Sequence, residues 1–151
     1  MATGYSLTSI PTSSAALATP VPVHVILRLE GLAAAALSAV FYAHIGASWW
    51  LFAALWLAPD LSMLGYLAGP GWGARIYNAI HAYVTPATLA VSALLLHSAA
   101  LVPIALIWIN HIGVDRLMGY GLKYPAGFGW THLGRLGRQR KNSIPASQES
   151  A

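Results

Sequence analysis

The chain has 151 residues, of which 57% are hydrophobic and only 8% are charged. An ordinary soluble domain carries about 25% charged residues, so the composition excludes a water-soluble globular domain and predicts an integral membrane protein. The formal net charge is +4, and the absence of cysteine excludes disulfide and thiol chemistry.

Apolar runs fill the middle of the chain, between two polar tails. We expect residues 1–23, rich in Ser, Thr, Ala and Pro, and the basic residues 135–151 to be disordered. Residues 24–134 between them then form one transmembrane domain. Its apolar runs, each long enough to cross about 30 Å of hydrocarbon, are 24–45, 48–68, 73–97 and 101–121.

Short joins between these runs predict antiparallel neighbours. The fold class we expect is therefore all-α, an integral membrane bundle of four transmembrane helices with up-down topology. Pro86 predicts a kink in the third helix. The boundary between the third and fourth helices stays open, because the apolar sequence is continuous across 84–109.

Basic residues gather at one end of this predicted bundle. Arg75 lies in the join AGPGWGAR at the start of the third run, and four more basic residues follow the fourth run within 135–141. With four spans, both groups fall on the side of the N-terminus, and loops rich in Lys and Arg face the cytoplasm. We therefore expect a multi-pass membrane protein with both termini in the cytoplasm.

Among the ionisable residues within the apolar runs, four stand out: Asp60, His81, His111 and Asp115. A rise of about 1.5 Å per residue places all four roughly 9–15 Å from the cytoplasmic boundary. An ionised aspartate at membrane depth costs about 2.5–3.5 kcal/mol even on a lenient scale, so such residues face the bundle interior and usually mark a site. Pro59 removes a backbone hydrogen bond, which predicts a bent or locally open helix beside Asp60.

The same four residues suit a metal ion. His111 and Asp115 are four apart and share one helix face, and imidazole with carboxylate suits zinc, manganese or iron. Asp60 and His81 could complete the site, which makes all four candidate metal ligands and catalytic residues. Around them, the candidates for contacting an anionic substrate group are Arg28, Arg75 and Arg116, and the candidates for supporting the ligands are Glu30, Tyr77 and Asn78.

A structural interpretation of these residues stays open. The two aspartates could neutralise the three arginines inside the bundle, and the two histidines could be packed residues that hydrogen-bond across helices. Lys123, in the segment after the fourth run, is expected to extend its ammonium to lipid head groups.

Several motifs resemble those of a known family. The segments LRLEGL, LAPDLSMLGYLAG, GARIYNAIHAYVTP, ALIWINHIGVDRLMGYGLKYP and THLG are similar to the bacterial membrane family known as domain of unknown function 4260, across 28–134. This resemblance implies a small helical inner-membrane protein and no particular catalytic activity.

A second, fainter resemblance is to inner-membrane proteins regulated by LexA and assigned as metal-dependent hydrolases. The Pro-Asp segment at 59–60, the later His81 and the His-x-x-x-Asp segment at 111–115 follow the same order as in those proteins. The relatives carry a second aspartate where this chain has Ser62, so the resemblance implies a related but smaller set of ligands.

Two functions from different classes are consistent with the sequence. The first is a metal-dependent, hydrolase-like site acting on a lipid or other amphiphilic substrate. The alternative is a non-enzymatic membrane protein, either a small-molecule or ion binder or an assembly subunit, with its buried charges paired for structure. The expected partners are membrane lipids together with a second copy of the chain or another membrane protein, and no nucleic acid.

Overall fold

The computed structural model describes residues 21–126 and 128–135, so most of both predicted tails lies outside the described residues. In chain order the elements are helix α1 (Val21–His44), helix α2 (Trp49–Leu55), the 3₁₀ helix η2 (Ala58–Ala68), helix α3 (Pro70–His81), helix α4 (Val84–Leu95), helix α5 (Leu101–Met118), strand β1 (Trp130–Thr131) and strand β2 (Gly134–Arg135). The described residues are thus mainly helical, as predicted. The sequence analysis missed the small antiparallel hairpin, in which Trp130 pairs with Arg135 and Thr131 with Gly134.

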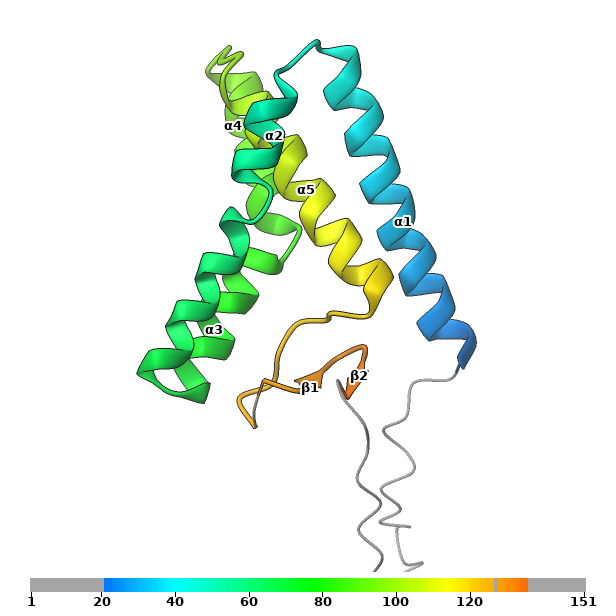
Figure 1. Cartoon of the computed structure of the whole chain (residues 1–151), viewed down its shortest axis with the longest axis vertical. Helices are drawn as coiled ribbons and strands as arrows, with labels where there is room; N and C mark the ends of the chain where they lie inside the picture. Colours follow the sequence, from blue (N-terminus) through cyan, green and yellow to red (C-terminus); the bar gives the residue numbers. More distant parts are fainter. Residues whose placement is uncertain (1–20, 127, 136–151) are drawn as a thin grey trace, which may run out of the picture.

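Helix α5 occupies the centre of the arrangement (Figure 1). It packs along α1 on one side and contacts α4 and α2 on the other. The chain leaves α2 through η2, turns, and returns as α3 packed against η2, before continuing into α4. The β1–β2 hairpin lies beyond the end of α5 in the same view.

Three described segments are long and apolar enough to cross a membrane: Val23–His44, Trp49–Ala68 and Leu101–Met118. They agree with the first, second and fourth predicted runs. The third run, predicted as one helix over 73–97, is instead divided between α3 and α4, and neither half has the length of a span.

The break in this third run has a local cause. Pro86 has no N–H to donate to the carbonyl of Ala82, and its ring would clash with that carbonyl in a continuous helix. Helix α3 therefore ends at His81, Ala82 is extended with φ −88° and ψ 134°, and α4 begins at Val84. Pro86 lies in the first turn of α4, where backbone N–H groups have no hydrogen-bond partner within the helix, so the missing N–H of proline costs nothing there. The predicted kink is thus a complete interruption of the helix.

A second proline shapes the segment that carries Asp60. Pro59 cannot donate to the carbonyl of Leu55, and α2 ends at that residue. The chain then continues as the 3₁₀ helix η2, in which the backbone N–H of Asp60 donates to the carbonyl of Leu57 over 3.1 Å. The α-helix is thus interrupted beside Asp60 by a change to 3₁₀ winding, where the sequence predicted a bent or locally open helix.

Small residues allow α1 and α5 to approach closely. A Cβ atom added at Gly113 would lie 2.7 Å from the backbone N of Ala35 and 2.7 Å from the backbone O of Gly31. Asn110 of α5 also donates to the carbonyl of Ala35 over 2.7 Å. Contacts between small residues of this kind are typical of helix pairs in membranes.

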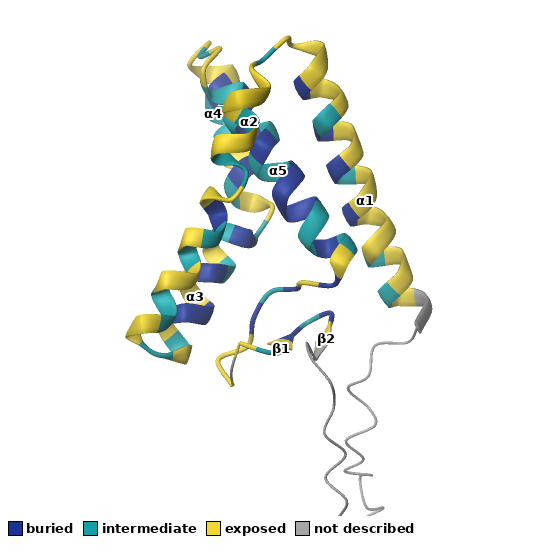
Figure 2. Ribbon diagram, in the orientation of Figure 1, coloured by how far each residue is buried: buried dark blue, intermediate teal, exposed yellow. Residues whose placement is uncertain are grey.

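The outward surfaces of the helices are apolar. Figure 2 shows that the outer side of α1 is largely exposed while a stripe facing α5 is buried. Trp50 and Leu67 are each 87% exposed, and Val40 is 65% exposed. A soluble monomer rarely exposes large contiguous apolar patches. Together with the three long apolar segments, this surface indicates a membrane protein.

Candidate metal centre

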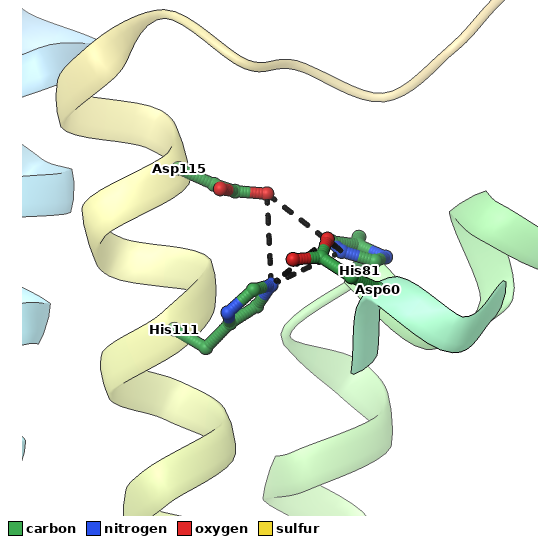
Figure 3. Close-up of side chains that lie close together, drawn as sticks. All are labelled: Asp60, His81, His111 and Asp115. Carbon is green, nitrogen blue, oxygen red and sulfur yellow. Dashed lines mark hydrogen bonds and ion pairs between the residues drawn. The ribbon is translucent and has the colours of Figure 1, made fainter. Parts of the chain in front are cut away.

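Four ionisable side chains meet at one point between η2, α3 and α5 (Figure 3). Asp60 comes from η2, His81 from the last residue of α3, and His111 and Asp115 from α5. Each offers one ligand atom, and all four atoms lie within 4.8 Å of one another. The predicted convergence of these residues is therefore confirmed.

The separations between these atoms match the size of a metal site. The Nε2 atoms of His81 and His111 are 3.3 Å apart, and Oδ1 of Asp60 is 3.5 Å from each of them. Oδ2 of Asp115 is 3.7 Å and 3.9 Å from the same two nitrogens. Ligands about 2.0–2.2 Å from a tetrahedral zinc ion lie roughly 3.3–3.6 Å apart. The four atoms are thus spaced much as the ligands of a single ion.

His81 is held in the orientation of a metal ligand. Its Nδ1 lies 3.1 Å from the carbonyl oxygen of Tyr77, and a carbonyl only accepts, so Nδ1 carries the hydrogen and donates it. In the neutral ring, the lone pair of Nε2 then points at two carboxylates. Such an arrangement is repulsive unless a cation, either a proton or a metal ion, lies between them. Donation from one ring nitrogen to a backbone carbonyl is also how metal-binding histidines are oriented.

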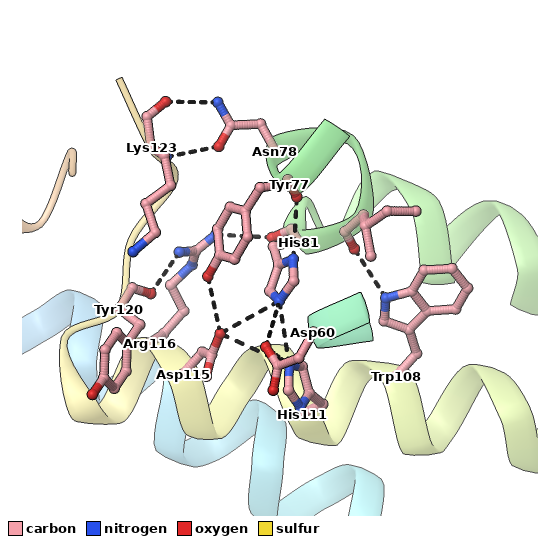
Figure 4. A network of polar contacts seen from close by, with 11 residues as sticks. Asp60, Tyr77, Asn78, His81, Trp108, His111, Asp115, Arg116, Tyr120 and Lys123 are labelled. Atoms are coloured by element: carbon pink, nitrogen blue, oxygen red, sulfur yellow. Dashed lines mark hydrogen bonds and ion pairs between the residues drawn. The ribbon is translucent and has the colours of Figure 1, made fainter. Parts of the chain in front are cut away.

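Tyr77 supports two of the four residues, as Figure 4 shows. Its ring stacks on the His81 ring with centroids 3.8 Å apart and planes 10° apart. Its hydroxyl donates to Oδ2 of Asp115 over 3.2 Å. The sequence placed Tyr77 among the supporting residues, and the structure shows these contacts directly.

The four ligands differ in their access to the surroundings. The side chain of Asp60 is 31% exposed, and that of Asp115 is 14% exposed. Both histidines are buried. Asp60 therefore marks the open side of the centre.

The predicted arginines lie away from the four ligand atoms. Arg116 is buried and donates to the carbonyls of His81, over 2.9 Å, and of Tyr120, over 2.8 Å. Arg75 is exposed and lies over the ring of Trp72, 5.3 Å from its centroid. Every ion pair among the described residues joins an aspartate of the centre to one of its histidines. The alternative that the aspartates neutralise arginines therefore finds no support in this part of the chain.

The remaining candidates also have other neighbours. Arg28 is exposed, and one of its guanidinium nitrogens lies beside Gly119 at the end of α5. Glu30 is exposed on α1. Asn78 donates to the carbonyl of Lys123 over 2.8 Å and accepts from its N–H over 2.7 Å. Asn78 thus anchors the segment after α5 and does not orient His81.

Sequence analysis misjudged Lys123. Lys123 is only 2% exposed, so the expected contact of its ammonium with lipid head groups is wrong. Its Nζ makes no hydrogen bond within the described residues and lies 4.0 Å, 5.1 Å and 5.7 Å from the ring centroids of Phe128, Tyr77 and Tyr120. The aromatic residues on both sides of Lys123 in the sequence were the signal that could have indicated its burial.

The same part of the chain matches a known family. A family model described as a domain of unknown function (DUF4260) covers residues 24–136. The chain belongs to this family. All four residues of the centre lie in the matched region of the DUF4260 protein, and no curated protein or solved structure matches it.

Proposed function

We propose that this DUF4260 protein binds one divalent transition metal ion between Asp60, His81, His111 and Asp115 and uses it to hydrolyse an amphiphilic substrate. The observation that carries the proposal is the meeting of four ligand atoms from three separate elements of an apolar, membrane-type protein. Ionisable groups in such surroundings are costly and rarely persist without a function.

The types of ligand narrow the choice of ion. Two neutral imidazoles and two carboxylates suit zinc, manganese or iron, and the two carboxylates balance the charge of a divalent ion. When bound, such an ion supplies Lewis acidity and acidifies a coordinated water. The surrounding residues orient the ligands and accept the proton. Tyr77 fixes the positions of His81 and Asp115, and Asp60 on the open side can accept a proton from an incoming water.

The neighbouring cavity supports an amphiphile as substrate. It has a volume of about 380 Å³, within the range of ligand sites. Its walls include Pro59 and Leu61 on either side of Asp60, together with Ile80 and Trp108. An apolar cavity beside a polar centre fits a molecule that joins an alkyl chain to a polar, hydrolysable group.

Hydrolysis is tested on the full chain purified in a non-ionic detergent and loaded with each of the three metals. We expect metal-dependent turnover of short-chain alkyl esters or phosphoesters. Loss of a ligand in Asp60→Asn lowers turnover by at least about 100-fold, more than the 10–100-fold typical of residues that only support a ligand. Glu30→Gln, which neutralises an exposed carboxylate outside the centre, serves as the matched control.

The outcomes of this test separate the two functions. Turnover that is the same without metal, or in Asp60→Asn, contradicts a metal-dependent hydrolase. Stoichiometric metal without turnover of any substrate favours the alternative, a non-enzymatic binder of ions or small molecules.

The proposal also includes a topology of four crossings, with α3 and α4 together forming the third. An interrupted helix is tolerated at membrane depth where it lines a site inside the protein. Because Arg75 and the basic residues after α5 belong on the cytoplasmic side, both termini lie in the cytoplasm, beneath a bacterial inner membrane. An alkaline phosphatase fusion at the C-terminus should then be inactive, and one at Gly46, between α1 and α2, should be active. The reverse pattern contradicts the topology.

A further inference from the structure

We propose that the hydrolysed group is a phosphate ester, and that the buried cations Lys123 and Arg116 supply the countercharge that selects it over a neutral ester. This inference rests on the metal centre proposed above and names the class of its substrate. Sequence analysis did not connect Lys123 with the centre, and the proposed hydrolysis alone does not require it.

The first observation is the place of Lys123 in the fold. The ammonium is buried among three aromatic rings, with the nearest centroid, that of Phe128, at 4.0 Å. In Figure 4, Tyr77 lies between Lys123 and His81. Its ring stacks on His81 and also lies 5.1 Å from the ammonium. A single aromatic ring therefore separates this cation from a ligand of the metal centre.

The ammonium lacks the partners that a buried charge needs. Within the described residues, its Nζ makes no hydrogen bond, although an ammonium has three hydrogens to donate. Interaction with aromatic faces offsets only part of the cost of burying a charge, and a buried charge without an ionic partner is strongly unfavourable. Burial lowers the pKa of Lys123, and the carboxylate of Asp115 opposes that shift. An anion at the centre would favour the charged form further.

Arg116 is the second buried cation. It follows Asp115 directly in the chain, and its guanidinium donates to the backbone carbonyl of His81. It is therefore linked to two of the four ligand residues. Part of its side chain lines a cavity of about 280 Å³ together with Tyr83 and His132. Figure 4 draws both Lys123 and Arg116 on the side of the centre where Tyr77 lies, and within the described residues neither forms an ion pair with an aspartate of the centre.

Counting charges identifies the class of substrate. The charges of the two aspartates, Lys123 and Arg116 sum to zero, although no ion pair joins them within the described residues. A divalent ion leaves an excess of two positive charges, which is costly in surroundings of low dielectric constant. A phosphate group carries about 1.5–2 negative charges near neutral pH and restores the balance. A neutral carboxylic ester does not.

The implied reaction is the hydrolysis of a phosphate monoester. The oxygen of water forms a bond to phosphorus while the bond from phosphorus to the alkyl oxygen breaks. One proton of the water passes to the departing oxygen, which gives an alcohol and inorganic phosphate. The apolar cavity beside Asp60 would accommodate the alkyl chain of that alcohol.

Inorganic phosphate is the probe that tests this inference. Calorimetric titration compares the metal-loaded full chain with its Lys123→Met variant, and Arg75→Gln, which removes an exposed cation outside the centre, is the control. We expect Lys123→Met to weaken phosphate binding by about tenfold or more and Arg75→Gln to leave it unchanged. The phosphate-free stability of Lys123→Met should be equal to or higher than that of the original chain, because an unpaired buried charge has been removed.

Equal phosphate affinity in Lys123→Met and the original chain overturns the inference, as does a metal-loaded chain that binds no phosphate. Metal content is measured first on the same samples. A chain without metal overturns the metal centre and this inference with it, whereas a metal-loaded chain indifferent to phosphate overturns this inference alone. If Lys123→Met does not fold, the original chain is assayed with an alkyl phosphate and an uncharged ester of equal chain length. Preference for the uncharged ester then overturns the inference.

Discussion

Helix α5 is held by its neighbours in two different ways. Against α1 it presents Gly113, where the two backbones approach so closely that even a Cβ atom does not fit. Against η2 and α3 it presents His111 and Asp115, which meet other polar atoms beside a cavity of about 380 Å³. Between helices in lipid, close packing of this first kind replaces the hydrophobic effect as a source of stability. The α1–α5 contact thus supplies a rigid support, and the opposite side of α5 carries costly ionisable groups.

The largest effect should come from filling the α1–α5 contact. In Gly113→Ala, the new Cβ lies 2.7 Å from backbone atoms of Ala35 and Gly31, which cannot move aside as a side chain can. Overpacking of this kind typically costs about 1–3 kcal/mol, a large share of a total stability of about 5–15 kcal/mol. The melting temperature in detergent should therefore fall clearly. Gly71→Ala, where a Cβ meets nothing within 4 Å, is the control. Equal melting temperatures for the two variants contradict the comparison.

Metal should stabilise the contact of α5 with η2 and α3 and leave the α1–α5 contact unchanged. A ligand present at 100 times its dissociation constant stabilises the folded state by about 2.7 kcal/mol. Adding zinc should raise the melting temperature of the original chain, and a chelator should reverse the rise. His111→Gln should not respond to either, and Gly71→Ala should respond as the original chain does. A zinc response that persists in His111→Gln would place the ion elsewhere.

Tyr77→Phe removes one hydrogen bond from the contact of α5 with η2 and α3 and leaves the α1–α5 contact unchanged. The ring can still stack on His81, but the bond from the hydroxyl to Asp115 is lost. Loss of a supporting partner of this kind typically weakens metal affinity about 10–100-fold. Competition with a chromogenic chelator measures the change, with the exposed Tyr124→Phe as control. An unchanged affinity would mean that Asp115 needs no orientation by Tyr77.

The smallest effect concerns the hairpin segment beside the polar contact. His132 accepts a hydrogen bond from the N–H of Leu122 through Nδ1, over 2.8 Å, which requires an unprotonated nitrogen. Burial and the charge of Arg116 lower the pKa of His132 below its ordinary value of about 6.5. The folded state therefore binds this proton less readily than the unfolded state. Its contribution to stability is complete above that ordinary value and is lost as the pH falls through the lowered one.

Hydrogen exchange of the amides in 122–133, corrected for intrinsic rates, should therefore show weaker protection at pH 5 than at pH 7.5. In His132→Asn, which keeps an acceptor and does not titrate, the difference should disappear. Protection of the original chain that is identical at both pH values rules out this role for His132.

The four ligands could be predicted from the sequence because their chemistry is conspicuous there. Only four acidic residues occur in the chain. The fixed rise of a helix relates position along the chain to depth in the membrane, which brings Asp60 and Asp115 to a similar level. The positions of Pro59 and Pro86 likewise indicated disturbed helices, because the effect of proline on its own backbone is local.

Other features depend on contacts between distant segments. Charge alone suggested that Arg116 pairs with an aspartate. Instead it donates to the carbonyl of His81, which is free to accept because α3 ends at that residue. Lys123 is buried because Asn78 binds its backbone and three aromatic rings surround its ammonium. Neither arrangement follows from the residues near it in sequence.

The metal content of the purified protein tests the central claim most directly. The full chain is purified in detergent without chelator and examined by plasma mass spectrometry, beside a variant that combines His111→Gln with Asp115→Asn. We predict about one zinc, manganese or iron ion per chain in the original protein and almost none in the variant. An original chain that holds no transition metal even after incubation with all three, or a variant that retains the same amount, would contradict the account.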